Sequence, residues 1–231
     1  MIIAVIPARG GSKRLPGKNI RDFCGQPIIK YSITAAIDSG VFDRVIVTTD
    51  SQEIGDVAKA CGAEIPFHRP AELSDDHTPT IAVIRHAVET LQQSGDAVDF
   101  ACCIYATAPF VQSDDLKQGL KQLQSGDGEF AFPVTTFPFP IMRSLKIDDD
   151  QIKMIWPEHE MSRSQDLVEA WHDAGQFYWG TSEAWKTASG LYSANCLPIR
   201  IPRWRVQDID TEEDWNRAQL MHQALCGKPG S

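Results

Sequence analysis

A loop rich in glycine and basic residues follows the first apolar run of the chain. Residues 7–19 read Pro-Ala-Arg-Gly-Gly-Ser-Lys-Arg-Leu-Pro-Gly-Lys-Asn. Gly10 and Gly11 let the backbone approach a ligand closely, so that amide groups and cations can face the same anion. Four cations fall within ten residues of an otherwise acidic chain: Arg9, Lys13, Arg14 and Lys18. We expect the loop to bind a polyphosphate; a solvated basic turn is the alternative.

Two familiar phosphate-binding motifs nearly match this loop, but both fail. A P-loop requires glycine at the position of Ser12 and a serine or threonine at the position of Asn19, where the hydroxyl would reach Mg²⁺. The dinucleotide pattern Gly-x-Gly-x-x-Gly does not occur in the loop, and no helical pattern begins at its glycines. The loop therefore argues against a P-loop kinase and against a NAD-dependent dehydrogenase.

A pair of carboxylates, Asp208 and Asp210, precedes the last helical pattern of the chain. Side chains at i and i+2 of an extended segment point the same way, which suits two oxygen ligands of one Mg²⁺ ion. Such an ion would neutralise triphosphate charge and stabilise a departing pyrophosphate. The alternative is that Asp210 caps the final helix and Glu213 completes a capping box. That alternative leaves Asp208 unexplained.

Three further polar segments are candidates for a binding site. Arg69 opens a polar run that ends at Thr78, and an arginine there can bind a phosphate bidentately, although a surface salt bridge is its commoner role. Residues 105–110 follow a predicted strand, where pocket walls are built, but also suit a plain strand-to-helix connection. His172 and Asp173 suggest a general base, yet no nucleophile-elbow serine or cysteine accompanies them. We interpret His172 as structural or substrate-orienting.

Short β-branched runs alternate with longer helical patterns over the first hundred residues, which is typical of βαβ units around a largely parallel sheet. Gly40 is a plausible end for the first helix, and Ser51 a plausible cap for the second. The predicted strands are 2–6, 44–50, 63–67 and 99–104. The predicted helices are 27–39, 51–61, 81–93 and 113–124.

The pattern changes after Gly128. Residues 130–140 are rich in phenylalanine and proline, and proline confines such strands to edges or bends. We expect residues 135–170 to leave the core sheet, with a hairpin within 141–155, and the chain to return through strands at 175–179 and 197–201 and a helix at 211–225. The excursion carries many large apolar side chains, which suggests burial against another subunit.

Composition limits the class of protein. A net charge of −9 argues against nucleic acid as a partner. No stretch of 18 apolar residues is present to span a membrane, and the short opening apolar run leads us to expect no signal peptide. The six cysteines form no CxxC pair, so we expect reduced thiols and a cytoplasmic location. We expect residues 1–231 to form a single domain that includes the excursion.

Five blocks in order resemble the cytidylyltransferases that activate sialic-acid-like sugars as CMP conjugates. The blocks are residues 6–19, 42–50, 69–73, 163–167 and 208–214. Sialic acid enzymes usually carry Gln-Pro-Thr-Ser-Pro where this chain has Tyr105-Ala-Thr-Ala-Pro109. Together with His172-Asp-Ala-Gly-Gln-Phe-Tyr-Trp-Gly180, this departure is similar to the pseudaminic acid branch of the family.

The resemblance implies a fold, a reaction and a set of site residues. The fold would be a Rossmann-like mixed, mostly parallel sheet with helices on both faces, of the nucleotide-diphospho-sugar transferase type, with the excursion forming a homodimer. CTP would be held by Ala8, Arg9, Gly10, Gly11, Ser12, Lys18, Asn19 and Arg69. Asp208 and Asp210 would bind Mg²⁺, and Lys18, Arg9 and Asp210 would be catalytic. The nonulosonic sugar acid would face Tyr105, Thr107, Gln176 and Tyr178, with Arg143 and Arg163 completing the site of the partner subunit.

The implied reaction is attack by the anomeric hydroxyl of the sugar acid on the α-phosphorus of CTP, with release of pyrophosphate. Positioning and electrostatic stabilisation account for most catalysis of this kind. N-acetylneuraminate, legionaminate and 3-deoxy-manno-octulosonate remain alternative acceptors. A non-catalytic nucleotide-binding module is an alternative from another class.

Overall fold

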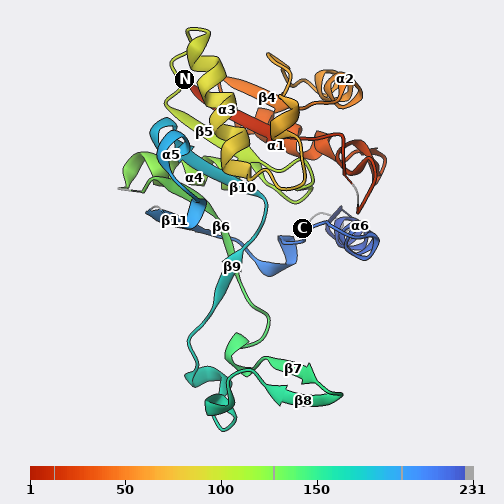
Figure 1. The fold of residues 1–231 in the computed structure, drawn as a ribbon, viewed down its shortest axis with the longest axis vertical. Coiled ribbons are helices and arrows are strands. Elements are labelled where there is room, and N and C mark those ends of the chain that lie inside the picture. Colours follow the sequence, from red (N-terminus) through yellow and green to blue (C-terminus); the bar gives the residue numbers. More distant parts are fainter. Residues whose placement is uncertain (13, 127, 194, 227–231) are drawn as a thin grey trace.

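The computed structural model describes residues 1–12, 14–126, 128–193 and 195–226 (Figure 1). Lys13, one of the four predicted loop cations, lies outside these described residues. The strands are β1 (Ile2–Pro7), β2 (Asp22–Phe23), β3 (Gln26–Pro27), β4 (Arg44–Thr48), β5 (Phe100–Ile104), β6 (Phe130–Thr136), β7 (Leu145–Asp148), β8 (Gln151–Met154), β9 (Trp171–Asp173), β10 (Phe177–Thr181) and β11 (Cys196–Arg200). The α-helices are α1 (Ile29–Ser39), α2 (Gln52–Ala60), α3 (Thr80–Gln93), α4 (Ser113–Ser125), α5 (Ser182–Thr187) and α6 (Glu212–Cys226).

The main sheet has the order β11-β6-β10-β5-β1-β4, with β9 pairing to β6. β1 is parallel to both β4 and β5, and β11 is parallel to β6. β10 enters antiparallel between β5 and β6. The prediction of a mixed, mostly parallel sheet is confirmed. Because β4, β1 and β5 run the same way, their carboxyl ends meet at one edge of the sheet.

Both faces of the sheet are covered by helices, so the central strands β1 and β5 are apolar at every position. Ala4 and Ile6 of β1 pack with α1, α2 and α4, while Ile3 and Val5 pack with α3 and α5 on the opposite face. This division follows from the alternation of side chains along a strand. A smaller cluster joins α6 to the loop after β1 through Leu15, Phe23, Ile28, Phe110, Ile209, Trp215 and Ala218.

Local signals define the ends of the first two helices as predicted. Gly40 follows α1 with φ of 65°, a left-handed conformation that glycine adopts without strain. The Ser51 side chain accepts a hydrogen bond from the Ile54 amide at the start of α2. The predicted strand at 63–67 is wrong, because only Glu64 bridges to Ile46 of β4. Pro66 explains this outcome, since it has no amide hydrogen and restricts the residue before it.

Of the two placements expected for this proline-rich segment, an edge or a bend, the edge is wrong. β6 pairs with β11 along one side and with β10 and then β9 along the other. Pro133 lies where the partner changes, since β10 pairs as far as Ala131 and β9 begins at Val134. The missing amide hydrogen of proline therefore falls in a gap of the ladder.

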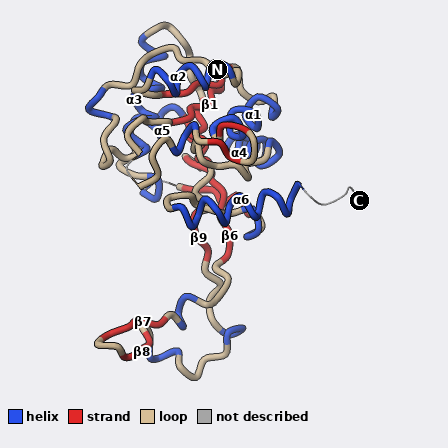
Figure 2. The backbone as a smooth tube through the Cα atoms, turned by 90° about the vertical axis from the view of Figure 1, so that its right-hand side faces the viewer, coloured by secondary structure: helices blue, strands red, loops and turns tan. Residues whose placement is uncertain are grey.

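Between β6 and β9 the chain forms an arm, defined here as residues 137–170. The arm carries the hairpin that the alternating pattern predicted; it is formed by β7 and β8, and Leu145 pairs with Met154. Figure 1 shows the hairpin well separated from the main sheet, and Figure 2 shows the same separation after a 90° turn. Several large apolar side chains of the arm are exposed: Phe137, Phe139, Leu145, Ile147, Ile152, Ile155, Trp156, Met161 and Val168.

Candidate functional site

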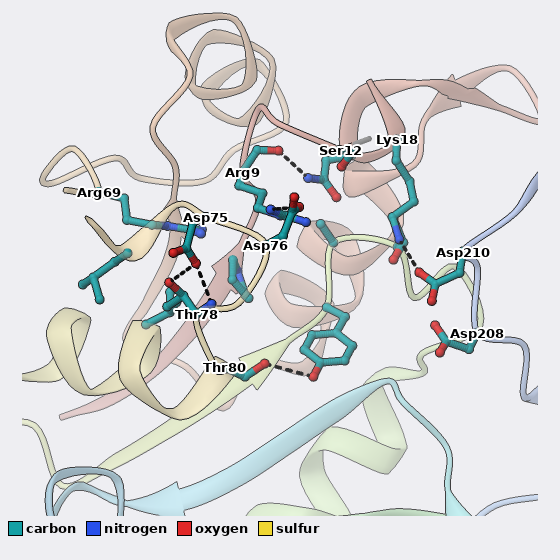
Figure 3. Close-up of a pocket in the computed structure, with 17 residues that line it drawn as sticks. Arg9, Ser12, Lys18, Arg69, Asp75, Asp76, Thr78, Thr80, Asp208 and Asp210 are labelled. Atoms are coloured by element: carbon teal, nitrogen blue, oxygen red, sulfur yellow. Dashed lines mark hydrogen bonds and ion pairs between the residues drawn. The ribbon is translucent and has the colours of Figure 1, made fainter. Parts of the chain in front are cut away.

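A polar cavity of about 330 Å³ opens at the carboxyl ends of β1 and β5. Nine residues predicted for the site line it: Arg9, Ser12, Lys18, Asn19, Arg69, Tyr105, Thr107, Asp208 and Asp210. They come from four separate stretches of the chain. Figure 3 shows Arg9, Ser12 and Lys18 on one side of the cavity, Thr80 on the other, and Asp208 and Asp210 beside Lys18.

The glycine-rich loop is held in place by side chains of neighbouring elements. The Gly10 amide donates to Asp50 Oδ1 at 2.9 Å, and Asn19 Nδ2 donates to the Arg9 carbonyl at 2.9 Å. A Cβ on Gly10 would lie 3.2 Å from the Ser51 Cβ, which is a tight contact, so the close approach to Ser51 favours glycine. Gly10, Gly11 and the fully buried Ala8 do not line the cavity themselves. Their predicted contacts to a nucleotide would be made by backbone atoms.

Lys18 lies against the pair of carboxylates, although 190 residues separate them in sequence. Its Nζ is 3.1 Å from Asp210 Oδ1 and donates to the Ile209 carbonyl at 2.7 Å. Arg14 Nη2 lies 3.0 Å from Asp210 Oδ2. Burial raises the pKa of Asp208, and the negative charge of Asp210 adds to this effect while Lys18 opposes it. A buried carboxylate is costly to ionise on its own, and a neighbouring cation stabilises its charged form.

The cap of α6 is made by residues other than Asp210. Thr211 Oγ1 accepts from the Asp214 amide at 3.2 Å, and Asp214 Oδ2 accepts from the Thr211 amide at 2.9 Å. This is a reciprocal capping box one residue later than the alternative interpretation required. The interpretation of Asp210 and Glu213 as the cap is therefore wrong. Both carboxylates, Asp208 and Asp210, line the cavity instead.

Two carboxylates and an open cavity fit a magnesium ion that takes its other ligands from phosphate oxygens and water. Among the described residues, no group of three histidine, cysteine, aspartate or glutamate side chains is arranged to hold a metal. Mg²⁺ does not require such a cage, because one or two carboxylates plus substrate phosphates are its usual protein environment. Asp208 and Asp210 are thus suitable donors.

Arg69 forms a buried wall of the cavity. Its Nε donates to Thr48 Oγ1 at 3.4 Å, and its Nη2 donates to the Thr48 carbonyl. Burial lowers the pKa of Arg69 to about 10; Asp50 opposes this shift and the positive charge of Arg9 adds to it. The side chain remains a cation at neutral pH. It is therefore a buried positive charge facing the same space as Arg9.

Several cavity residues were not predicted: Asp75, Asp76, Thr78 and Thr80. Asp76 pairs with Arg9 at 2.5 Å. Asp75 Oδ1 accepts from the Thr78 amide and hydroxyl at 2.7 and 2.6 Å, which closes a tight turn before α3. The Asp-x-x-Thr spacing is the sequence signal for this turn. The prediction for residues 69–78 concerned only Arg69.

Four residues predicted to face the sugar acid lie outside the cavity. Tyr178 is buried behind Tyr105, with ring centroids 5.4 Å apart. Gln176 is also buried, and its Nε2 donates to the Arg205 carbonyl at 2.5 Å. Arg143 and Arg163 lie on the arm, where Arg163 Nε donates to Asp166 at 2.8 Å. Within one chain, the structure does not bring these four side chains to the cavity.

Fold and site together define a nucleotide-binding enzyme of the cytidylyltransferase family, and the comparison with known families agrees. The family model described as "Cytidylyltransferase" matches residues 3–187. The chain belongs to this family. A solved structure of CMP:2-keto-3-deoxy-manno-octonic acid synthetase in complex with CTP has the same fold, with a TM-score of 0.70 at 17% identity over 96% of this chain and 99% of that one.

Two curated relatives are similar to this chain over almost their whole length. The pseudaminic acid cytidylyltransferase of Campylobacter jejuni serotype O:2 is 43% identical over 95% of this chain and 95% of its own length. The CMP-N,N'-diacetyllegionaminic acid synthase of Legionella pneumophila is 31% identical over 93% of both chains. In the described part of the chain, no helix is long and apolar enough to cross a membrane.

Proposed function

We propose that this chain transfers CMP from CTP to pseudaminic acid, giving the CMP-sugar and pyrophosphate. The observation that carries the proposal is the meeting of the basic glycine-rich loop with Asp208 and Asp210 in one cavity of a cytidylyltransferase-family fold. The 43% identity to a pseudaminic acid cytidylyltransferase, against 31% to a legionaminic acid synthase, favours pseudaminic acid as the acceptor.

The cavity walls support distinct roles for the residues around a bound nucleotide. Lys18, Arg9 and the loop amides would bind the phosphates and stabilise charge that develops on the departing pyrophosphate. Arg69 would contact the nucleotide from the side opposite the glycine-rich loop. Its charge is buried and therefore little screened by solvent. Tyr105 and Thr107 would line the acceptor side. The anomeric hydroxyl then attacks the α-phosphorus in line as pyrophosphate leaves.

The proposal includes Mg²⁺ held by Asp208 and Asp210. Bound there, the ion would supply positive charge to the phosphate oxygens and acidify the attacking hydroxyl. Lys18 Nζ, at 3.1 Å from Asp210, would keep that carboxylate turned towards the phosphates. A strong protein base is not required for this reaction, since positioning and electrostatics account for most of the catalysis.

A homodimer and a reducing compartment complete the proposal. The exposed apolar side chains of the arm, with Ile147 and Phe139 each 79% exposed, support burial against a second copy. Arg143 and Arg163 lie on the same arm and would reach the cavity of the partner. The buried adjacent thiols of Cys102 and Cys103 support the cytoplasm as the location.

Pyrophosphate release with CTP and Mg²⁺ tests the function directly. Pseudaminic, N-acetylneuraminic and legionaminic acids are supplied in parallel, and we expect release with pseudaminic acid at least tenfold faster than with the other two. Release with only one of the others would overturn the acceptor and keep the reaction. A folded chain that binds CTP but releases no pyrophosphate with any acid would instead be a non-catalytic binding module.

A further inference from the structure

Asp76 places a negative charge inside the cavity that the proposed function assigns to a triphosphate. Its carboxylate lines the cavity and forms an ion pair with Arg9, whose Nη1 lies 2.5 Å from Asp76 Oδ1. Figure 3 shows the two side chains meeting in the cavity. On charge alone, an anion at this point would repel the phosphates of a nucleotide. The presence of Asp76 beside Arg9 therefore needs a reason other than direct contact with the ligand.

The backbone around Asp76 is held by a turn that Asp75 closes. Asp75 Oδ1 accepts hydrogen bonds from the His77 amide at 2.9 Å, from the Thr78 amide at 2.7 Å and from the Thr78 hydroxyl at 2.6 Å. An aspartate that bonds to backbone amides two and three residues further on stabilises a tight turn. The carboxylate of Asp76 is consequently presented to Arg9 from a defined position.

Arg9 needs such a partner because a second cation faces the same space. Arg69 also lines the cavity, and its guanidinium is held in place by Thr48. Burial is the main cause that lowers the pKa of Arg69, and the positive charge of Arg9 adds to it. The two cations therefore repel each other. The Arg9 side chain is 29% exposed, so repulsion would turn it towards solvent unless a carboxylate held it.

We propose that Asp76 is a positioning residue that holds the Arg9 guanidinium inside the cavity, so that Arg9 and Arg69 can face the same nucleotide. The proposal rests on the proposed function, because it takes Arg9 as a ligand of the CTP phosphates. Asn19 already holds the backbone of Arg9, and Asp76 holds the far end of its side chain. A guanidinium carries five N–H donors, so pairing through one nitrogen leaves donors for a phosphate. A cation held ready spares the ligand the cost of ordering it.

The direction of the effect separates positioning from simple repulsion. If Asp76 only repels the phosphates, its removal tightens the binding of CTP. If Asp76 holds Arg9, its removal weakens the binding of CTP while Arg9 is present. Once Arg9 is absent, removal of Asp76 has nothing left to release and only relieves repulsion. A double-mutant cycle measures this dependence directly.

Asp76→Ala, Arg9→Ala and the double variant form the cycle. Asp76→Asn is added because it removes the charge and keeps the shape of the side chain. Glu72→Ala is the matched control, since it removes one carboxylate from an exposed position of the same segment that does not line the cavity. The dissociation constant for CTP is measured by calorimetry with Mg²⁺ at one salt concentration. Thermal unfolding checks that each variant is folded.

We expect Asp76→Ala to raise the Kd for CTP about tenfold, and Asp76→Asn to raise it about threefold, as contacting residues are coupled. In the Arg9→Ala background, Asp76→Ala should leave the Kd unchanged or lower it. Glu72→Ala should stay within about twofold of wild type. Tighter binding or no loss in Asp76→Ala would overturn the positioning role, and so would an equal loss with and without Arg9.

Binding and turnover distinguish this inference from the proposed function. A wild-type chain that binds CTP but releases no pyrophosphate with any acid would overturn the proposed function alone, because calorimetry still measures the coupling. A wild-type chain that does not bind CTP would overturn both.

Discussion

Single side chains decide the electrostatics of the cavity. Lys18 is the clearest case, because its ammonium group lies between the Asp210 carboxylate and the Ile209 carbonyl and is mostly shielded from solvent. Arg14 contacts the other oxygen of the same carboxylate, but its side chain is 72% exposed. The two cations share a partner and differ in burial, so they form a matched pair for mutation.

Lys18→Ala is expected to lower kcat by about 100-fold or more, since a shielded cation beside developing phosphate charge is worth roughly 3 kcal/mol in such sites. Arg14→Ala should cost less than about fivefold, because solvent screens an exposed charge. Pyrophosphate release measures both rates, and circular dichroism checks that both variants are folded. Equal losses in the two variants would mean that Lys18 contributes only general positive potential.

At the scale of elements, a buried ion pair ties the segment before Asp208 to α4. Arg205 donates through both terminal nitrogens to Asp115, and both side chains are buried. Arg205 belongs to the short 3-10 helix Arg203–Arg205, which lies just upstream of the carboxylate pair. Its carbonyl also accepts from Gln176. This pair therefore positions the chain that carries Asp208 and Asp210.

Asp115→Asn should destabilise the fold by about 3–5 kcal/mol, because it leaves the Arg205 charge buried without a carboxylate. Asp114→Asn is the control on the neighbouring position, where an exposed pair with Lys117 contributes at most about 0.5 kcal/mol. Urea unfolding followed by tryptophan fluorescence gives both free energies of unfolding. A loss below about 1 kcal/mol for Asp115→Asn would show that the pair is not a structural tie.

Packing of α4 against the sheet also restricts the size of the side chain at position 119 of this helix. A Cβ on Gly119 would lie 2.5 Å from Trp179 Cδ1 and 2.8 Å from Ile199 Cδ1. Trp179 is fully buried, stacks on Phe42 and donates to the Leu116 carbonyl. Its ring therefore has no space into which it could shift to accommodate a Cβ at position 119. Close packing of the helix on the sheet depends on the missing side chain.

Gly119→Ala is expected to destabilise the fold by about 1–3 kcal/mol through overpacking, although alanine favours a helix over glycine by about 1 kcal/mol. Gly55→Ala in α2 is the control, since its Cβ would meet Thr49 and Ile65 only at ordinary contact distances of 3.8 and 3.9 Å. That variant should gain up to about 1 kcal/mol. Thermal unfolding of the two variants should move in opposite directions.

At the scale of the whole molecule, the arm exposes apolar side chains that packing within a single chain does not bury. Its hairpin exposes Ile147 and Ile152 on a segment well separated from the core (Figure 1). Exposed apolar surface of this extent on a two-stranded hairpin is costly in water, and the proposed burial against a second copy would remove that cost. Each buried side chain of this size contributes about 1.5–3 kcal/mol.

Ile147→Asp should shift the proposed dimer towards monomer by at least about 100-fold in Kd, because an unpaired carboxylate would be desolvated in the interface. Leu220→Asp on α6 is the control, as Leu220 is also exposed but lies outside the arm. Sedimentation equilibrium over a range of concentrations measures both. A wild-type chain that stays monomeric at high concentration would overturn the dimer itself.

Local patterns determined much of this protein. The alternation of β-branched runs with helical periods predicted the strands around β1, β4 and β5 and the helices between them, because side-chain periodicity is a property of neighbouring residues. Gly40 and Ser51 marked helix ends for the same reason. The loop after β1 was predicted as a site from its glycines and cations, since those residue types are defined without reference to the rest of the chain.

Tertiary structure alone decided which of these residues meet. Asp76 pairs with Arg9, and Thr80 meets Tyr105, only because α3 crosses the sheet beside β1 and β5. Gln176 and Tyr178 carry the right chemistry in sequence, yet β10 runs antiparallel to β5 and places them behind the cavity wall. Strand order and direction depend on packing between segments distant in sequence, and no local pattern encodes that packing.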